Sequence, residues 1–219
     1  MRRALLSLSC LLAAGAAQAE IALYPTGPSE DSAFLRFVNA TPAPLQLVAA
    51  GSSASLELKT ANSVSDYLPV PAGKPIKGTL KQPAASAALD LSVAPGEFAT
   101  VVAIADAKGL RQVVVREQPD DFNGLKASLA FVNVDPACTG AALRPAGRNA
   151  DLFKDGAEGQ VQRRSINPVK LSVQLVCANA NVGAPVDLGD LQAGERYSVI
   201  VLPGANGPQA LATVDTLAH

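Results

Sequence analysis

The chain contains Leu35-Arg36-Phe37-Val38-Asn39-Ala40-Thr41-Pro42-Ala43, and the pattern L-x-F-V-N-x-x-P-A returns 94 positions later as Leu129-Ala130-Phe131-Val132-Asn133-Val134-Asp135-Pro136-Ala137. A repeat at so long a period indicates that a whole folding unit has been copied. The 219-residue chain has room for two copies of about 95–100 residues each, which is a common domain size.

Two weaker echoes follow the same order. Gly96-Glu97, with the β-branched run behind it, matches Gly194-Glu195 at an offset of 98 positions. Leu68-Pro69-Val70 resembles Asn167-Pro168-Val169 at an offset of 99. The three matches nearly keep their spacing, so we interpret the sequence as a tandem duplication.

Each copy carries the local pattern of short strands. We expect strands at residues 33–39, 98–104, 112–115, 170–177 and 197–202, which alternate in polarity or are rich in β-branched side chains. Asp106-Ala107-Lys108-Gly109 is a turn sequence between two of them. The Ala-rich residues 83–91 leave one helical turn open as an alternative to a strand.

These patterns predict an all-β fold of two tandem β-sandwich domains, Ig-like or jelly-roll-like, that arose by internal duplication. We place the N-terminal sandwich at residues 20–118 and the C-terminal sandwich at residues 125–219. Residues 119–124 contain Pro, Asp, Asn and Gly, which are typical of a linker.

The first 19 residues have the features of an export signal. Met1-Arg2-Arg3 is positively charged, residues 4–14 are mostly apolar, and Ala17-Gln18-Ala19 is an A-x-A cleavage site. We expect cleavage after Ala19 and a periplasmic mature protein. A membrane anchor is the alternative, but the apolar run is short for a bilayer.

Two cysteines, Cys138 and Cys177, remain after the signal, in which Cys10 lies. An even number of cysteines in an exported chain predicts a disulfide between them. Two separate buried thiols are the alternative. The bond would lie wholly within the second copy and would stabilise it by about 3–4 kcal/mol.

Composition argues against several functions. Two of the 18 basic side chains belong to the signal, so 16 remain against 19 acidic ones, and nucleic-acid binding is not expected. The one histidine is the last residue, His219, and neither G-x-S-x-G nor a P-loop occurs. We therefore expect no catalytic residues, no metal and no cofactor.

Some side chains are candidates for binding. Tyr24 and Tyr67 are candidates for stacking on sugars, with burial as the alternative. Arg163 and Arg164 form a double charge on an apparent turn, with solvation as the alternative. Arg36 lies within a strand, where it faces water or pairs with a carboxylate.

Four blocks resemble the AlgF family of periplasmic alginate O-acetylation proteins. The blocks are Ala22-Leu23-Tyr24, Ser32-Ala33-Phe34-Leu35-Arg36-Phe37-Val38-Asn39-Ala40, Ile166-Asn167-Pro168-Val169-Lys170 and Gly194-Glu195 with its β-branched run. The matched blocks add Asn39, Asn167 and Lys170 to the candidate binding residues.

The resemblance implies an accessory protein that is needed for acetylation of a secreted exopolysaccharide and has no recognised catalytic residues. Its implied partners are a periplasmic SGNH-type acetyltransferase and a membrane-bound O-acyltransferase, and possibly the polymer itself. The polymer is alginate or, as in related systems, cellulose.

Three hypotheses follow. The first is an adaptor whose two domains hold components of the acetylation machinery, or the polymer, near each other. The second is a carbohydrate-binding module without an adaptor role. The third is an enzyme built from dispersed Ser, Asp and Lys side chains.

Overall fold

The computed structural model describes residues 32–119 and 123–218, which form seventeen strands and contain no helix. The first half holds β1 (Ser32–Asn39), β2 (Leu45–Ala49), β3 (Ser55–Leu58), β4 (Ser63–Val64), β5 (Leu68–Pro71), β6 (Ile76–Lys81), β7 (Ser86–Leu91), β8 (Phe98–Asp106) and β9 (Gly109–Glu117). The second half holds β10 (Ala127–Asn133), β11 (Ala141–Pro145), β12 (Phe153–Gly156), β13 (Val161–Ile166), β14 (Lys170–Cys177), β15 (Ala180–Asp190), β16 (Arg196–Gly204) and β17 (Gly207–Val214).

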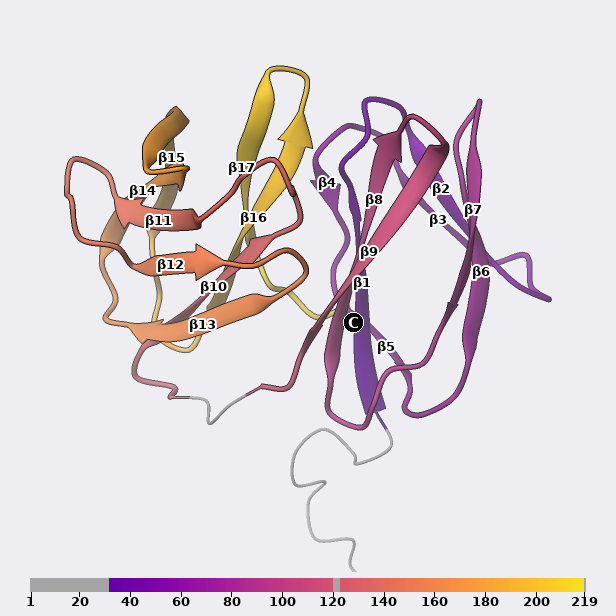
Figure 1. Cartoon of the computed structure of the whole chain (residues 1–219). Helices are drawn as coiled ribbons and strands as arrows, with labels where there is room; N and C mark the ends of the chain where they lie inside the picture. The colour runs from indigo at the N-terminus through magenta and orange to yellow at the C-terminus, as the bar shows by residue number, and fades with distance from the viewer. Residues whose placement is uncertain (1–31, 120–122, 219) are drawn as a thin grey trace, which may run out of the picture.

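The strands form two β-sandwiches that lie side by side (Figure 1). In the first, the sheet β4-β1-β8-β9, with β5 also paired to β1, covers the sheet β3-β2-β6-β7. In the second, the sheet β13-β10-β16-β17 covers the sheet β12-β11-β14-β15. The same strand order and the same parallel pair, β1 with β8 and β10 with β16, occur in both. The prediction of two tandem β-sandwiches is confirmed.

Strand register supports the duplication residue by residue. Leu35 of β1 lies opposite Ala99 of β8, and Leu129 of β10 lies opposite Tyr197 of β16. The offsets between the copies are therefore 94 at the first strand of this pair and 98 at the second. These are the offsets of the first two sequence echoes.

The third echo is wrong by three positions. Leu68 of β5 lies opposite Leu35 as Arg164 of β13 lies opposite Leu129. Leu68 therefore corresponds to Arg164, whereas Asn167 lies in the turn after β13. Similar Pro-Val dipeptides in a strand and in a turn produced the false match.

Three apolar cores hold the molecule together. Two fill the sandwiches, and the third lies between the sandwiches and joins β1 and β8 to β10 and β16. Leu35 and Phe37 point into the first sandwich, whereas Val38 points into the shared core, where Ile200 and Leu202 of β16 meet it. These strands are buried on both faces, so their apolar runs are continuous rather than alternating.

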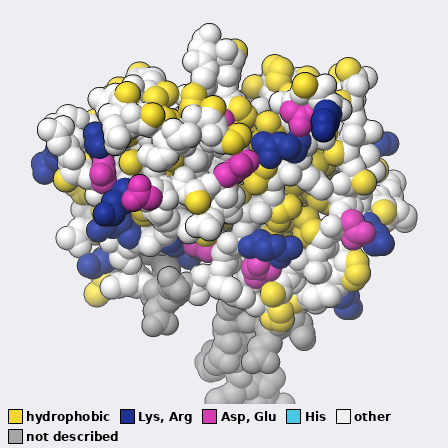
Figure 2. Space-filling view, viewed as in Figure 1, with side chains coloured by type: hydrophobic (Ala, Val, Ile, Leu, Met, Phe, Trp, Pro, Cys, Tyr) yellow, Lys and Arg dark blue, Asp and Glu magenta, His cyan; other side chains and the backbone are white. Residues whose placement is uncertain are grey.

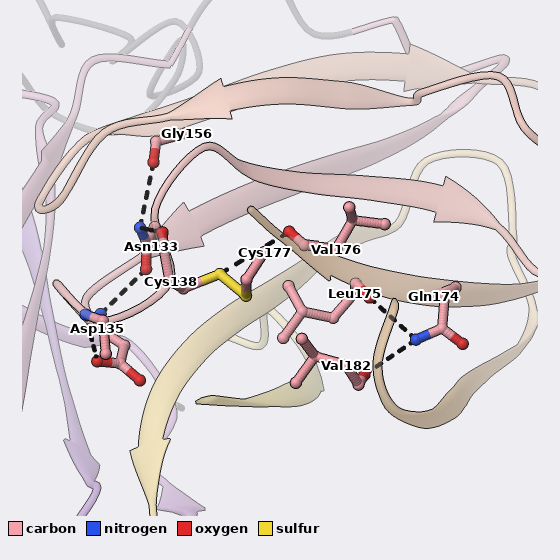
Figure 3. The surroundings of a disulfide bond; sticks show 10 residues. Asn133, Asp135, Cys138, Gly156, Gln174, Leu175, Val176, Cys177 and Val182 are labelled. Carbon is pink, nitrogen blue, oxygen red and sulfur yellow. Dashed lines mark hydrogen bonds between the residues drawn. A yellow bond between two sulfur atoms is a disulfide. The ribbon is translucent and has the colours of Figure 1, made fainter. Parts of the chain in front are cut away.

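Other predictions fall within the described residues. Cys138 and Cys177 form the predicted disulfide, which ties the loop before β11 to the end of β14 (Figure 3). The helical alternative for residues 83–91 is wrong, because residues 86–91 form β7, with Leu89 and Leu91 pointing into the first core. The predicted signal peptide lies outside the described residues, as do residues 120–122 of the predicted linker, and both the signal and the domain limits stay predictions.

Candidate functional site

A cluster of charged side chains lies between the two sandwiches, beside the shared apolar core. At its centre is Arg36 of β1, only 2% exposed. Its Nη1 atom donates to Oδ1 of Asp215 at 2.6 Å, and its Nε atom donates to Oγ1 of Thr100 at 2.9 Å. Its Nη2 atom donates to Oγ of Ser198 at 3.1 Å. Of these three partners only Thr100 belongs to the first sandwich, so the guanidinium group joins the two domains.

Two arginines of the second half, Arg163 and Arg196, extend the network to Glu117, which ends β9 in the first half. Arg163 of β13 donates from Nη2 to Oδ2 of Asp215 at 3.0 Å and to Oε2 of Glu117 at 3.0 Å, and its Nε atom also bonds Glu117. Arg196 donates from Nη2 to Oε1 of Glu117 at 3.3 Å. Three guanidinium groups, including that of Arg36, thus face two carboxylates.

Two aromatic rings close one side of the cluster. The guanidinium carbon of Arg36 lies 4.4 Å from the ring centre of Tyr67, and that of Arg196 lies 5.2 Å from the ring centre of Phe98. The two rings pack edge to face at 4.9 Å. The Tyr67 hydroxyl is 3.2 Å from Oγ1 of Thr100. Cation–π contacts of this kind gain strength when water is excluded.

The cluster members occupy equivalent positions of the two copies. Arg36 lies opposite Thr100 on β8, and Ala130, its counterpart on β10, lies opposite Ser198 on β16. Thr100 and Ser198 are therefore equivalents, and both bond the same guanidinium group. Ala130 points to the same side of its strand as Val132, which belongs to the shared core. Of the two equivalent positions, 36 and 130, only the first therefore carries an arginine.

The two acids are equivalents as well. Glu117 ends β9 opposite Phe98, and the backbone amide of Asp215, just after β17, donates to the carbonyl of Arg196, the counterpart of Phe98. Tyr67 and Arg163 correspond in the same way, because their neighbours Leu68 and Arg164 do. Duplication thus produced a nearly symmetric interface, which unequal side chains turned into an ion-pair network.

The ionisation of the cluster follows from its burial and its charges. Burial opposes ionisation of Asp215, but Arg36 and Arg163, with hydrogen bonds from Ser198 and Arg163, outweigh it and hold the pKa of this carboxyl below its usual value. Burial raises the pKa of Tyr67. Burial, and then the positive charge of Arg163, lower the pKa of Arg196.

The C-terminal residues fasten the interface. The backbone of Tyr67 donates to the carbonyl of Thr216 at 2.8 Å and accepts from the amide of Ala218 at 2.9 Å. The Thr216 hydroxyl also bonds the carboxylate of Asp66. Residues 215–218 therefore leave the second sandwich and pair with the first, and Figure 1 shows the yellow end of the chain reaching the purple sandwich.

The structure brings three of the predicted binding residues together. Arg36, Tyr67 and Arg163 meet in the cluster. Arg36 pairs with a carboxylate instead of facing water. Tyr67 is buried, so it is not exposed for stacking on a sugar. The prediction of a turn at Arg163 and Arg164 is wrong, because both lie within β13, where Arg164 is exposed and Arg163 is not.

The other candidates lie elsewhere. Asn39 is fully buried, and its amide nitrogen bonds the backbone carbonyls of Ala43 and Thr60. Its counterpart Asn133 donates to the carbonyls of Cys138 and Gly156 in the same manner (Figure 3). Both asparagines fix a loop. Asn167 and Lys170 are exposed around the β13–β14 turn, and Tyr24 lies outside the described residues.

Sequence reasoning missed five polar or charged cluster members. They are Thr100, Glu117, Arg196, Ser198 and Asp215. One signal could have found Thr100 and Ser198: the apolar runs in β8 and β16 have no polar face, so a second layer must cover them. Polar residues that interrupt such runs, like Thr100 and Ser198, must then find partners in that layer.

The cluster is a joint rather than an open site. Asp215 and Arg36 have side chains 1% and 3% exposed, and the Ser198 hydroxyl donates to Asp215 at 2.7 Å, so we assign no nucleophile there.

Among the described residues, no His, Cys, Asp and Glu side chains group to hold a metal ion, and no helix is long and apolar enough to cross a membrane. On the face in Figure 2, basic and acidic side chains are interspersed.

Fold and cluster define a class, an all-β protein of two duplicated sandwiches that are joined face to face through buried charges. The chain belongs to the AlgF family, since the family model described as alginate O-acetyl transferase AlgF matches residues 4–198. Membership gives the chain a role in alginate O-acetylation and confirms the family resemblance. The cellulose alternative stays a prediction.

A solved structure is also similar to this chain. It is the C-terminal domain of AlgF from P. aeruginosa, with 24% sequence identity and a TM-score of 0.34. The match covers 41% of this chain and 98% of that one. No curated protein matches the chain.

Proposed function

We propose that this protein is a non-catalytic periplasmic adaptor that alginate O-acetylation requires. The observation that supports this proposal best is the joint between the sandwiches. Arg36, Asp215 and Arg163 are buried across it, and breaking such a network leaves uncompensated charges in a dry interior. The two sandwiches therefore hold their outer loops at a fixed separation, which suits a protein that positions other proteins.

The end of the second sandwich where β10 and β14 begin is the surface that we assign to a partner. Leu125 is 84% exposed and Val169 is 48% exposed. The amide of Gly194 donates to the carbonyl of Lys126, and that of Leu191 to Val169, so the three loops lie together. Asn167 and Lys170 flank Val169, and exposed apolar side chains beside polar ones are typical of docking surfaces.

The partner of this surface is, in our proposal, the SGNH-type periplasmic acetyltransferase, with the membrane-bound O-acyltransferase as the acetyl source. A sugar-binding module is less well supported, because none of the aromatic side chains in residues 32–119 and 123–218 is exposed, and stacking on sugars needs an exposed ring. Export of the chain and cleavage after Ala19 are part of the proposal.

The proposal is tested by co-purification of the tagged full-length chain with the acetyltransferase of the same bacterium. We expect Val169→Asp, which places a charge in the apolar patch, to reduce the recovered acetyltransferase. Val214→Asp is the matched control, because Val214 is 45% exposed at the end of β17 and outside this loop cluster. Equal recovery with both variants would contradict the assigned surface. Hydrolysis of a chromogenic acetyl ester by the purified chain would contradict the non-catalytic part.

A further inference from the structure

The first sandwich contains an apolar cleft that neither the ionic cluster nor the loop surface explains. Its volume is about 330 Å³, within the size range of small-molecule sites. The cleft lies between the two sheets, where the edge strands β3 and β5 face each other. Its apolar lining includes Leu35, Phe37, Leu47, Leu56, Leu68 and Val70.

The second sandwich fills the same place with aromatic rings. Leu47 pairs with Leu56 across β2 and β3, and Leu143 pairs with Phe153 across β11 and β12. A leucine in one copy thus stands where the other copy has a phenylalanine. Phe153 stacks on Phe131, the counterpart of Phe37, with ring centres 5.7 Å apart. Protein interiors are close-packed, so the cleft of the first copy is space that the second copy fills with a side chain.

The second sandwich also closes its edge. Arg164 of β13 donates to the carbonyl of Leu152 at 2.7 Å, and Gln162 donates to that of Lys154 at 2.9 Å, so side chains of one sheet bond the edge of the other. Leu68 stands at the position of Arg164 in the first sandwich and lines the cleft instead. The first copy therefore lacks both a ring at the position of Phe153 and an arginine at the position of Arg164.

We propose that the cleft binds the single alkyl chain of an amphiphile. Its deep lining is apolar, and the exposed polar residues that border it, Ser55 and Lys77, are at its surface. A peptide or a sugar would bring several amide or hydroxyl groups into a lining whose polar side chains are those of Ser55, Lys77 and Thr79 alone, at a substantial cost. An alkyl chain buries only methylene groups and leaves its polar head beside Ser55 and Lys77. This inference does not depend on the proposed adaptor role.

The test is a titration of the full-length mature protein, labelled with nitrogen-15, with dodecanoate below its micelle concentration. We expect saturable chemical-shift changes confined to β1, β2, β3, β5 and β6. Dodecyl maltoside, which has an uncharged head, should bind at the same place. Acetate, which has the head but no chain, should not.

Variants that copy the second sandwich make the test specific. Leu56→Phe fills the cleft with a ring, and Leu68→Arg introduces an arginine at the position equivalent to Arg164. We expect each variant to weaken dodecanoate binding by at least about tenfold, the scale set by a methylene group in an apolar pocket. Leu125→Arg is the matched control, since Leu125 is exposed and distant in the fold. Dodecanoate should raise the melting temperature of the unmodified protein and of Leu125→Arg only.

Three results would overturn the proposal. They are no saturable binding of dodecanoate, equal binding by Leu56→Phe and the unmodified protein, or shift changes centred on the second sandwich. Leu68→Arg changes a partly exposed edge residue, so it keeps the test decisive where Leu56→Phe fails to fold.

Discussion

Arg36 and Asp215 are 179 positions apart, and their side chains meet at 2.6 Å in the interior between two domains. One residue belongs to the first strand of the first sandwich and the other follows the last strand of the second. The ion pair therefore joins the two ends of the described chain. The sandwiches cannot separate without exposing an apolar core and breaking this pair.

Asp215→Ala should destabilise the protein strongly. It leaves Arg36 and Arg163 without their shared carboxylate in a buried place, and removal of one partner of a buried pair typically costs about 3–5 kcal/mol. Denaturation by urea measures the change. Asp90→Ala, which breaks the exposed pair of Asp90 with Lys77, should cost no more than about 1 kcal/mol. Equal effects of the two variants would contradict a buried joint.

Stability should fall in acid because of Asp215. Its pKa in the folded protein is below the usual value, so the unfolded chain binds more protons than the folded one as the pH drops. The stabilisation is fully present above the pKa of the unfolded chain, about 3.9, and is lost as the pH falls through the lower folded value. Urea titrations between about pH 2.5 and 6 would show this loss of stability. Asp215→Asn should flatten that part of the pH profile.

Reduction of the disulfide between Cys138 and Cys177 should destabilise the second sandwich. The bond closes a loop of 39 positions, for which chain entropy predicts about 3–4 kcal/mol. Calorimetry with and without reductant measures the effect. Because the shared core couples the sandwiches, we expect one lowered transition, and two well-separated transitions would show that the domains unfold independently.

Asn39→Ala and Asn133→Ala should have similar effects in the two copies. Each change removes an amide that bonds buried backbone carbonyls, and an unsatisfied buried group costs about 1–3 kcal/mol. Thermal melts of the two variants measure the effect. The exposed Asn167 is the control, and its replacement by Ala should leave the melting temperature nearly unchanged.

The sequence allowed the fold to be predicted because duplication leaves its trace in local patterns. The L-x-F-V-N motif around Asn39 and Asn133 recurs because both asparagines cap the same loop. The cysteine pair is predictable from the even number of cysteines and from the expected export signal. Arg36 was recognised as a residue that needs a carboxylate or water, since a charge within an apolar strand has few other choices.

The joint between the copies could not be predicted in the same way. Its partners are distant in sequence, and Asp215 lies in a short segment without a repeat signal. The alternating pattern around Arg36 left water and a carboxylate open as its partner, and only the continuous apolar runs in β8 and β16 indicate burial of such strands on both faces. The cleft in the first sandwich depends on differences such as Leu56 against Phe153, which matter only once strand register is known.

The measurement that tests the central claim most directly is the O-acetyl content of secreted alginate, with polymer yield, in a strain that lacks this chain. The strain is complemented with the natural chain, with Val169→Asp or with Val214→Asp. The account predicts that acetyl content falls in the deletion strain while polymer yield holds. The natural chain and Val214→Asp should restore acetylation, and Val169→Asp should not. Unchanged acetyl content after deletion, or loss of the polymer itself, would contradict a role as an acetylation adaptor.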